Sequence, residues 1–470
     1  MSTTPTATPG DPGRRSSRSR LSLDTTTVLS VLLPLVTLGA LLLVHVGGQG
    51  RPAATPTRTP LTSASLVCPA PLPGASAAYL STTRQGVRGK VSLRSGKDTS
   101  SARLAEGRVT TVRQGGDSLV ATGTGDLAPG LVGARFGTAG HLAAVACQPT
   151  SPDEWFTGVG GGARHSSVLE LLNPDEGPAV ADIAVYSASG VVDVPRLHGV
   201  SVPGRSSVRL DISAIAPRRG DLALHVVTER GRLAASLLDT SDELASAAPS
   251  DDWLPAQPAP ATDNYLLGVT PGPADRVLTL ANDGDSETRA SLRFVTEDST
   301  FAPEGVDDVR VPPQSAVRVL LSSVLGSDAA DGVVGLEVTS GSPVTATLRT
   351  VSGGDLSHVV ARPALRSGTT AVVPGGRKQL VLAGAGGVGA VQVVARSASG
   401  RQLASSRASL RPGQAALVDL PPAAALVTVT PQGTTVHAAV VVSGAGQAVL
   451  PLADPVLNGL VPAVGPGLPR

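Results

Sequence analysis

Hydrophobic residues follow two different patterns along this chain of 470 residues. From Val28 to Val46 the run VLSVLLPLVTLGALLLVHV is continuously apolar, and His45 is its only titratable side chain. A helix of about 19 residues spans roughly 30 Å, which is the thickness of the hydrocarbon core of a bilayer. The run therefore predicts a transmembrane helix over 28–46.

Basic residues before the apolar run predict its orientation. The segment 1–27 holds Arg14, Arg15, Arg18 and Arg20 against only two acids. Because cytoplasmic flanks are enriched in Lys and Arg, we expect this tail in the cytoplasm and the bulk of the chain outside. A cleaved signal peptide would have the same polarity, but the run is long for one and no Ala-x-Ala site follows it. We therefore expect an uncleaved, single-pass anchor in the cell membrane.

Beyond the anchor, apolar residues come in short runs. Examples are 168–171, 277–280 and 379–382, which lie between segments rich in Gly, Pro, Asn or Asp. Short runs of this kind with period-two alternation are typical of strands that pack one face inward. Since no long helical pattern follows residue 46, the predicted fold class is all-β.

The strand pattern repeats, which indicates tandem modules. Segments that begin at His165, Asp275 and Arg377 each give a strand, a polar or glycine turn and a second strand, and a Pro-containing turn with another strand follows each. Trp155 precedes the first copy and Trp253 the second, so the two tryptophans are predicted to be equivalent. Copies of about 90 to 110 residues with roughly seven strands have the size of immunoglobulin-like β-sandwiches.

These patterns divide the chain into predicted segments. They are a basic cytoplasmic tail (1–27), the anchor (28–46), a Pro/Thr-rich stalk (47–65), a degenerate N-terminal β module (66–149) and three β-sandwich modules (150–245, 246–362 and 363–470, the last with a C-terminal tail). The Ala/Pro-rich segment 242–263 is interpreted as an inter-module linker. Modules joined end to end predict a rod or an arc, and a more closed arrangement stays open.

Charge and cysteine content limit which cellular compartment and which partners we expect for the protein. The formal net charge is +1, with acids and bases interspersed, so no basic stripe is available for nucleic acid. Cys68 and Cys147 are the only cysteines, and in an oxidising compartment they are expected to form a disulfide. That bond would close a loop of about 80 residues and stabilise the fold by about 4 to 5 kcal/mol. Two free buried thiols are the alternative.

Motifs that suggest a cofactor or a metal fit hairpin turns better. Gly384 to Gly389 reads GxGxxG, but neither a helix nor an acid at the expected distance follows it. Asp283 to Glu287 lies at the equivalent turn of another copy and lacks the spacing of an EF-hand. We therefore expect no cofactor and no metal, with a weak inter-module calcium site at Asp251 and Asp252 left open.

No arrangement of side chains marks a catalytic centre in the sequence. The histidines are scattered without HxH or HExxH spacing, and no GxSxG segment occurs. A glycosidase needs only two carboxylates about 5 to 10 Å apart, which a sequence alone does not reveal. We expect a protein that is not an enzyme, with a hydrolase that uses an unrecognised carboxylate pair as the alternative.

Two tryptophans and a glycine-rich loop form the candidate ligand or interaction surface. Trp155 and Trp253 could stack on sugar rings, although their matched positions favour structural anchors. The loop beside Trp155 contains Gly160 and Gly161. If the protein has a glycan-binding surface, we expect these four residues to form it.

In its motifs the chain resembles the actinobacterial family known as domain of unknown function 5719. The resemblance rests on Cys68-Pro, Ala-Cys147, SPDEWFTGVGGGARHSSVLELLNPDEG from Ser151 and VPGRSSVRLDI from Val202, and it covers about residue 60 to the end. The third module lacks the tryptophan and the Asn-Pro turn. The resemblance implies membrane-anchored, extracytoplasmic proteins without an assigned activity, often encoded near a large membrane glycosyltransferase of envelope assembly.

Anchor, repeats and resemblance together predict a single-pass cell-envelope protein whose C-terminal bulk is extracytoplasmic. Its expected role is that of a non-enzymatic scaffold or accessory subunit for the glycosyltransferase machinery that makes envelope polysaccharide. The alternative is a surface protein that binds carbohydrate or peptidoglycan through Trp155 and Trp253. Expected partners are the membrane and either an envelope glycosyltransferase or a glycan, but not nucleic acid.

Overall fold

A computed structural model describes residues 25–46, 57–113, 116–137, 142–242, 248–444 and 446–461. Most of the predicted tail at 1–27, most of the stalk at 47–65 and the end of the C-terminal tail lie outside the described residues. The chain divides into two compact units, one of which is formed by residues 59–459. The other includes the N-terminal helix, and each unit is described by itself.

Helix α1 (Thr25–Val46) covers the apolar run and contains Pro34. Its described side chains, at 28–41, are predominantly apolar and exposed, as Leu35 is at 65%. The hydroxyl of Thr37 donates to Leu33 O at 2.9 Å, which satisfies a polar group on this apolar helix. Among the residues that the structure describes, no helix is both long and apolar enough to cross a membrane.

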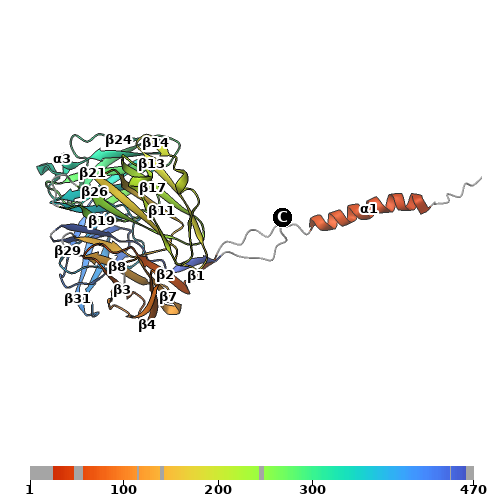
Figure 1. The fold of residues 1–470 in the computed structure, drawn as a ribbon, viewed down its shortest axis with the longest axis horizontal. Coiled ribbons are helices and arrows are strands. Elements are labelled where there is room, and N and C mark those ends of the chain that lie inside the picture. Colours follow the sequence, from red (N-terminus) through yellow and green to blue (C-terminus); the bar gives the residue numbers. More distant parts are fainter. Residues whose placement is uncertain are drawn as a thin grey trace, which may run out of the picture. The chain divides into compact units, whose positions relative to one another are not determined.

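The prediction of an all-β fold is confirmed for residues 59–459, which consist mainly of strands with a few short helices (Figure 1). The N-terminal module has two sheets, ordered β10-β2-β7-β4-β5 and β6-β3-β8-β9. Its strands are β2 (Ser63–Cys68), β3 (Ala77–Thr82), β4 (Arg88–Ser95), β5 (Asp98–Ala105), β6 (Thr110–Arg113), β7 (Leu119–Thr124), β8 (Leu131–Gly137), β9 (Ala143–Ala146) and β10 (Gln148–Pro149), with η1 (Gly125–Leu127) after β7.

A disulfide closes the core of the N-terminal module. Cys68, at the end of β2, is bonded to Cys147, which lies between β9 and β10, so this prediction is confirmed. Both cysteines are buried in one apolar cluster with Leu80 and Leu119. The bond therefore ties strands from the two sheets across their shared core.

The first module, β11 to β19, forms one continuous sheet that folds back on itself. Each half of the sheet has a central strand that pairs with a neighbour on both sides. In one half β17 lies between β11 and β13, and in the other β12 lies between β16 and β18. The elements are β11 (Asp153–Gly161), β12 (His165–Leu172), β13 (Ala179–Ser187), β14 (Gly190–Val192), η2 (Pro195–Leu197), β15 (Val200–Val202), β16 (Ser207–Asp211), α2 (Ile212–Ile215), β17 (Arg219–Arg230), β18 (Ala234–Ser241) and β19 (Ser250–Leu254).

The second module, β20 to β27, repeats this pairing with one change. Strand β26 pairs with β20 and β22 over its first half and with β21 and β27 over its second half, so it joins two sheets in a single strand. The elements are β20 (Ala261–Leu267), β21 (Asp275–Asn282), β22 (Thr288–Val295), β23 (Thr300–Phe301), β24 (Val309–Val311), β25 (Ser315–Leu320), α3 (Ser322–Leu325), η3 (Asp328–Ala330), β26 (Gly335–Ser352) and β27 (Asp355–Val360).

The third module has two separate sheets, ordered β28-β33-β30-β31 and β32-β29-β34-β35. Its strands are β28 (Thr369–Val372), β29 (Arg377–Ala383), β30 (Gly389–Arg396), β31 (Gln402–Leu410), β32 (Ala416–Leu420), β33 (Leu426–Gln432), β34 (His437–Ser443) and β35 (Gln447–Pro451). Strand β29 lies between β32 and β34, just as β21 lies between β25 and β26. The remaining strands, β1 (Thr57–Pro60) and β36 (Asn458–Val461), pair with each other.

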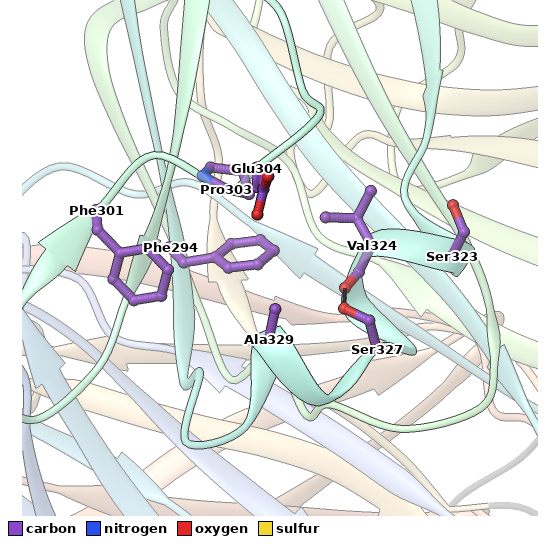
Figure 2. A pocket seen from close by; sticks show the side chains of 8 residues that line it. All are labelled: Phe294, Phe301, Pro303, Glu304, Ser323, Val324, Ser327 and Ala329. Atoms are coloured by element: carbon purple, nitrogen blue, oxygen red, sulfur yellow. Dashed lines mark hydrogen bonds between the residues drawn. The ribbon is translucent and has the colours of Figure 1, made fainter.

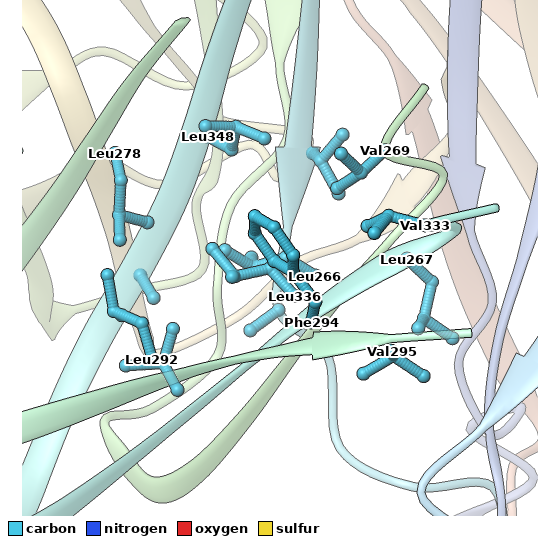
Figure 3. Close-up of a cluster of buried hydrophobic side chains, with 14 of the residues drawn as sticks. Leu266, Leu267, Val269, Leu278, Leu292, Phe294, Val295, Val333, Leu336 and Leu348 are labelled. Carbon is cyan, nitrogen blue, oxygen red and sulfur yellow. The ribbon is translucent and has the colours of Figure 1, made fainter. Parts of the chain in front are cut away.

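Each module has an apolar core, and the largest one extends into a neighbour. Figure 3 shows part of the cluster in the second module, where Leu266, Phe294 and Leu336 are almost fully buried. Val381 and Val441 of the third module belong to the same cluster. Burial of each such side chain contributes about 1.5–3 kcal/mol, so packing between modules is part of the folding energy.

The modules close on one another rather than extending as a rod or an arc. Strands of the N-terminal and third modules lie side by side although they are far apart in the sequence (Figure 1). Apolar clusters join every consecutive pair of modules and also the third module to the N-terminal module. They place Val67 and Val120 with Leu172 and Ala234, Ala223 with Ala281 and Ala316, Leu266 with Val381 and Val441, and Ala134 with Val372 and Leu426.

The predicted linker at 242–263 differs from the structure. It contains β19, which pairs with β18 from Leu237↔Leu254 to Ser241↔Ser250 and so completes the sheet of the first module. Strand pairing therefore ends the first module after Leu254 rather than at residue 245. Two consecutive acids, Asp251 and Asp252, hid this strand, because one of them lies on its inward face.

Candidate functional site

The closing strands of the four modules meet around β27. All residues of β27 are buried, and its backbone and side chains bind three other modules. Asp355 Oδ1 accepts from Leu142 N of the N-terminal module at 3.2 Å, and its Oδ2 accepts from Gln447 N of the third module at 2.8 Å. Leu356 N donates to Ser250 Oγ of the first module at 2.9 Å. One short strand thus links all four modules.

A row of histidine and carboxylate side chains continues from β27 into the first module. We call His165, Asp221, Asp239, Asp252 and His358 the junction cluster. Asp239 lies at its centre and is 0% exposed. It accepts from His165 Nε2 at 2.9 Å and from His358 Nε2 at 3.0 Å. The cluster therefore connects β12 and β18 of the first module to β27 of the second.

The alternation of β18 explains why an acid is buried here. Leu237, Asp239 and Ser241 point to the inward face of the strand at period two. The strand register places Asp239 directly opposite Ser167 on β12, and opposite Asp252 on β19. Ser167 Oγ donates to Asp239 Oδ1 at 2.5 Å, so polar residues face each other across three neighbouring strands.

His358 lies near two carboxylates that would otherwise repel each other. Like charges directly opposite on paired strands are destabilising, and Asp239 and Asp252 are both buried. The Nδ1 atom of His358 is 3.5 Å from Asp252 Oδ2, while its Nε2 is bonded to Asp239. A protonated His358 places one positive charge between the two carboxylates, which reduces their repulsion in the core.

The electrostatics of the cluster favour this charged arrangement. Burial alone would lower the pKa of His358, but its contacts with Asp239 and Asp252 raise that pKa to about 9. Burial would raise the pKa of Asp239, yet His165 and His358 hold it below its usual range. Burial raises the pKa of Asp252 to about 6, an effect that His358 partly offsets. At neutral pH the three groups are therefore all ionised.

The other end of the cluster reaches a second contact between modules. Asp221 on β17 adopts a left-handed backbone conformation with φ of 49°, which non-glycine residues rarely do. Its Oδ2 lies 3.3 Å from Nε of Arg318 on β25 of the second module, and its Oδ1 lies 3.7 Å from His165 Nδ1. Ion pairs at both ends of the cluster thus hold the first and second modules together.

The chemistry of the cluster is that of a buried charge network. Ser167 Oγ donates to Asp239 and accepts from Gly160 N at 2.8 Å, so the hydroxyl takes part in the network in both roles. Four of the five cluster side chains are at most 7% exposed, and His165 is 11% exposed. Within the described part of the chain, no group of three or more His, Cys, Asp or Glu side chains could hold a metal ion.

Raising the pH from 6.5 to 9 is expected to remove the stabilisation that His358 provides. Its folded-state pKa lies above the model-peptide value of 6.5, so the contribution is complete below pH 6.5 and is lost as the pH rises through about 9. The difference in unfolding free energy between the native chain and the His358→Gln variant should shrink by about 3 kcal/mol over this range. Urea unfolding at several pH values measures it.

Comparing the native chain with the His358→Gln variant separates the pH dependence of stability that His358 causes from that of Glu154, whose pKa lies in an overlapping range. Burial raises the pKa of Glu154 to about 8, and a hydrogen bond from Ala235 N and the charge of Arg362 partly offset this. Glu154 therefore lowers the stability of both proteins equally as the pH rises from about 4.5 to 8. A difference that stays constant from pH 6.5 to 9 would show that His358 is not charged in the native state.

The candidate surface predicted at Trp155, Gly160, Gly161 and Trp253 does not exist as a surface, because all four residues are buried. Trp155 is 2% exposed and stacks on His225 with ring centroids 4.1 Å apart. Trp253 is 3% exposed and donates its Nε1 hydrogen to Ala70 O at 3.0 Å. Neither ring is free to stack on a sugar. Both fill gaps between modules, as structural anchors do.

The two tryptophans are not equivalent in the fold. Trp155 lies on the opening strand β11 of the first module, and Trp253 lies on its closing strand β19. The glycines beside Trp155 allow a close approach of two strands. A Cβ atom at Gly160 would lie 2.4 Å from His165 O, so only glycine fits beside the junction cluster.

The turn motifs lie in turns, as the sequence predicts, but these are not hairpins, because the strands on either side of each turn do not pair with each other. Asn173 donates from Nδ2 to Gly177 O and Val202 O, and Asn282 makes the equivalent bonds to Ser286 O and Val311 O. Both side chains fasten the turn between two strands to the Pro-containing turn of their module. The segments 283–287 and 384–389 follow β21 and β29, and each leads to a strand that does not pair with the strand before it. Asp252 of the predicted calcium position faces the junction cluster instead.

The junction cluster is not evident from the sequence, although one signal points to it. The histidines are far apart in the sequence and no motif joins them. The signal was a polar residue at an inward position of an apolar alternation, as in LLDTS around Asp239 and DLSHVV around His358. Such residues indicate a buried partner without identifying it.

A comparison with known protein families gives a match. Residues 108–421 match DUF5719, a family of unknown function. The match covers more than half of the chain, and it includes the whole junction cluster. No curated protein matches this sequence.

Proposed function

The chain belongs to DUF5719, a family of unknown function, and from this premise we propose that it is a membrane-tethered, extracytoplasmic scaffold. Its modules would be immunoglobulin-like sandwiches and its role non-enzymatic. The proposed partner is a membrane glycosyltransferase of envelope assembly, which the family resemblance supports. The observation that carries the proposal is the closure of four modules around β27 and the junction cluster.

Closure matters because it makes a stiff body from modules that would otherwise move independently of one another. Interfaces between domains usually allow relative motion unless they are large and apolar or strongly bonded. Here Asp355 of the second module binds backbone groups of the N-terminal and third modules. Asp239 of the first module binds His358 of the second. Buried charged side chains thus join modules. A stiff body can hold partners at fixed positions.

Two features support a location outside the membrane with a tether. A disulfide persists in oxidising compartments and is rare in the cytosol, and Cys68–Cys147 closes the N-terminal module. Helix α1 exposes apolar side chains on all sides, as Leu33, Leu35 and Leu38 do at 60% or more. An exposed apolar surface of this kind is typical of a contact with lipid or with another apolar surface. Together they favour a single-pass anchor.

Placing charges in the middle of α1 is expected to release the protein from the membrane. Arginine at the centre of a membrane helix costs about 2.5–3.5 kcal/mol, so Leu35→Arg with Leu38→Arg should prevent stable insertion. The native chain should stay in the membrane pellet after alkaline extraction, and a protease added outside intact cells should digest residues 57–461. The matched control, Leu35→Val with Leu38→Val, should behave like the native chain. Extraction of the native chain at alkaline pH would contradict the tether.

A further inference from the structure

A cavity of about 250 Å³ lies at one end of the second module (Figure 2). Its lining comes from the end of β22, from the segment after β23 and from α3 and η3. A water molecule takes about 30 Å³ in the liquid, and pockets for drug-sized ligands start near 300 Å³. The cavity therefore has room for a side chain rather than for a large ligand.

The walls of this cavity are mainly apolar. Phe294 and Phe301 meet edge to face with ring centroids 5.9 Å apart, and Phe301 is 37% exposed although it is apolar. Val324 and Ala329 line the opposite wall. Ser327 also lines the cavity, but its hydroxyl already donates to Val324 O at 2.8 Å. The walls suit an aliphatic chain.

One exposed carboxylate, that of Glu304, lies at the rim of this apolar space. Figure 2 shows Glu304 pointing between Phe294 and Val324. No hydrogen bond or ion pair links Glu304 to another residue that the structure describes. By contrast, the buried carboxylate of Glu337 on the same module has partners in Tyr265 and Arg293. An unpaired acid at the mouth of an aromatic cavity is suited to binding a cation.

The surrounding charge favours the same ligand. The two segments that line the cavity, 297–308 and 323–331, contain no Lys, Arg or His. They carry seven acids: Glu297, Asp298, Glu304, Asp307, Asp308, Asp328 and Asp331. Charges of one sign around a concave site with apolar walls concentrate counter-charges there. This end of the module is therefore complementary to a basic group.

We propose that this cavity is a docking site for a basic side chain, lysine or arginine, of a partner protein. The aliphatic stem would lie against Phe301, Val324 and Ala329, while the charged head would pair with Glu304. Long basic side chains bury their stems in this way and keep the head at a polar site. The inference rests on the proposed scaffold function, since it names the chemistry of one partner contact.

The test uses a single thiol at the rim of the cavity. The chain has only two cysteines, both in the disulfide, so the Ser323→Cys variant carries one free thiol. Its alkylation by N-ethylmaleimide is measured in the full chain in detergent, with acetyl-Gly-Lys-Gly-amide or the arginine peptide added. A bound peptide should slow alkylation about tenfold at ten times its Kd. The matching norleucine peptide, which has no charge, should not.

Two further variants identify the residue that binds the charge. Adding Glu304→Gln should abolish protection by both basic peptides, whereas adding Glu297→Gln, which removes an acid outside the lining, should preserve it. Equal protection by the norleucine peptide, or none by either basic peptide, would overturn the proposal. So would protection that survives Glu304→Gln. None of these results depends on whether the chain is tethered, so failure here is distinct from failure of the scaffold proposal.

Discussion

Replacing Asp239 with asparagine is expected to lower the free energy of unfolding by about 3–5 kcal/mol, the usual cost of removing one partner from a buried ion pair. The amide would place hydrogen atoms or a neutral oxygen where His165, His358 and Ser167 now donate. His358 would keep its charge next to Asp252 alone. Urea unfolding followed by tryptophan fluorescence measures the loss.

A neighbouring acid supplies the control for this variant. Asp251 lies beside Asp252 on β19, points to the other face and accepts from Thr240 Oγ1 at 2.6 Å. Because Asp251 is partly solvated, Asp251→Asn should cost about 1 kcal/mol or less. If Asp239→Asn is no more destabilising than Asp251→Asn, the junction cluster does not hold the modules together.

Removing the disulfide is expected to lower the free energy of unfolding by about 4 to 5 kcal/mol, because the bond closes a loop with a sequence separation of 79. The variant is Cys68→Ala with Cys147→Ala, and the alanines leave no polar group in the buried cluster around Leu80. The loss should fall on the N-terminal module first. Since that module also packs on the first and third modules, its unfolding should open the whole arrangement.

Reduction of the native chain provides an independent check. Dithiothreitol should shift the urea midpoint of the native protein to that of the double variant and leave the variant unchanged. A native protein that keeps its midpoint after complete reduction would show that the bond does not stabilise this fold, whatever its loop length.

Local sequence signals predicted the strands and turns well because their physical causes are local. Alternation with period two set the inward faces of strands such as β13 and β22, and Asn282 marked a turn that its own side chain fastens. Gly384 to Gly389 was correctly assigned to a turn since neither a helix nor a suitable acid follows. The pairing of Cys68 with Cys147 followed from their being the only two cysteines.

The closure of the modules and the junction cluster could not be predicted in the same way. Both depend on contacts between residues far apart in the sequence, as Asp239 and His358 are at 119 positions. The tryptophans were misassigned because similar acidic segments precede both, whereas the strand register places Trp253 on a closing strand. A buried acid and an exposed acid have the same letter in a sequence, and only packing distinguishes Asp252 from Asp251.

Cross-linking in intact cells tests the scaffold proposal most directly. The chain is cross-linked, purified in mild detergent, and compared with a control in which an unrelated exported domain replaces residues 57–461 behind the same helix. We predict that a membrane glycosyltransferase of envelope assembly is the dominant protein joined to the native chain and is missing from the control. Equal recovery of such an enzyme with both proteins, or its absence from both, would contradict the proposal.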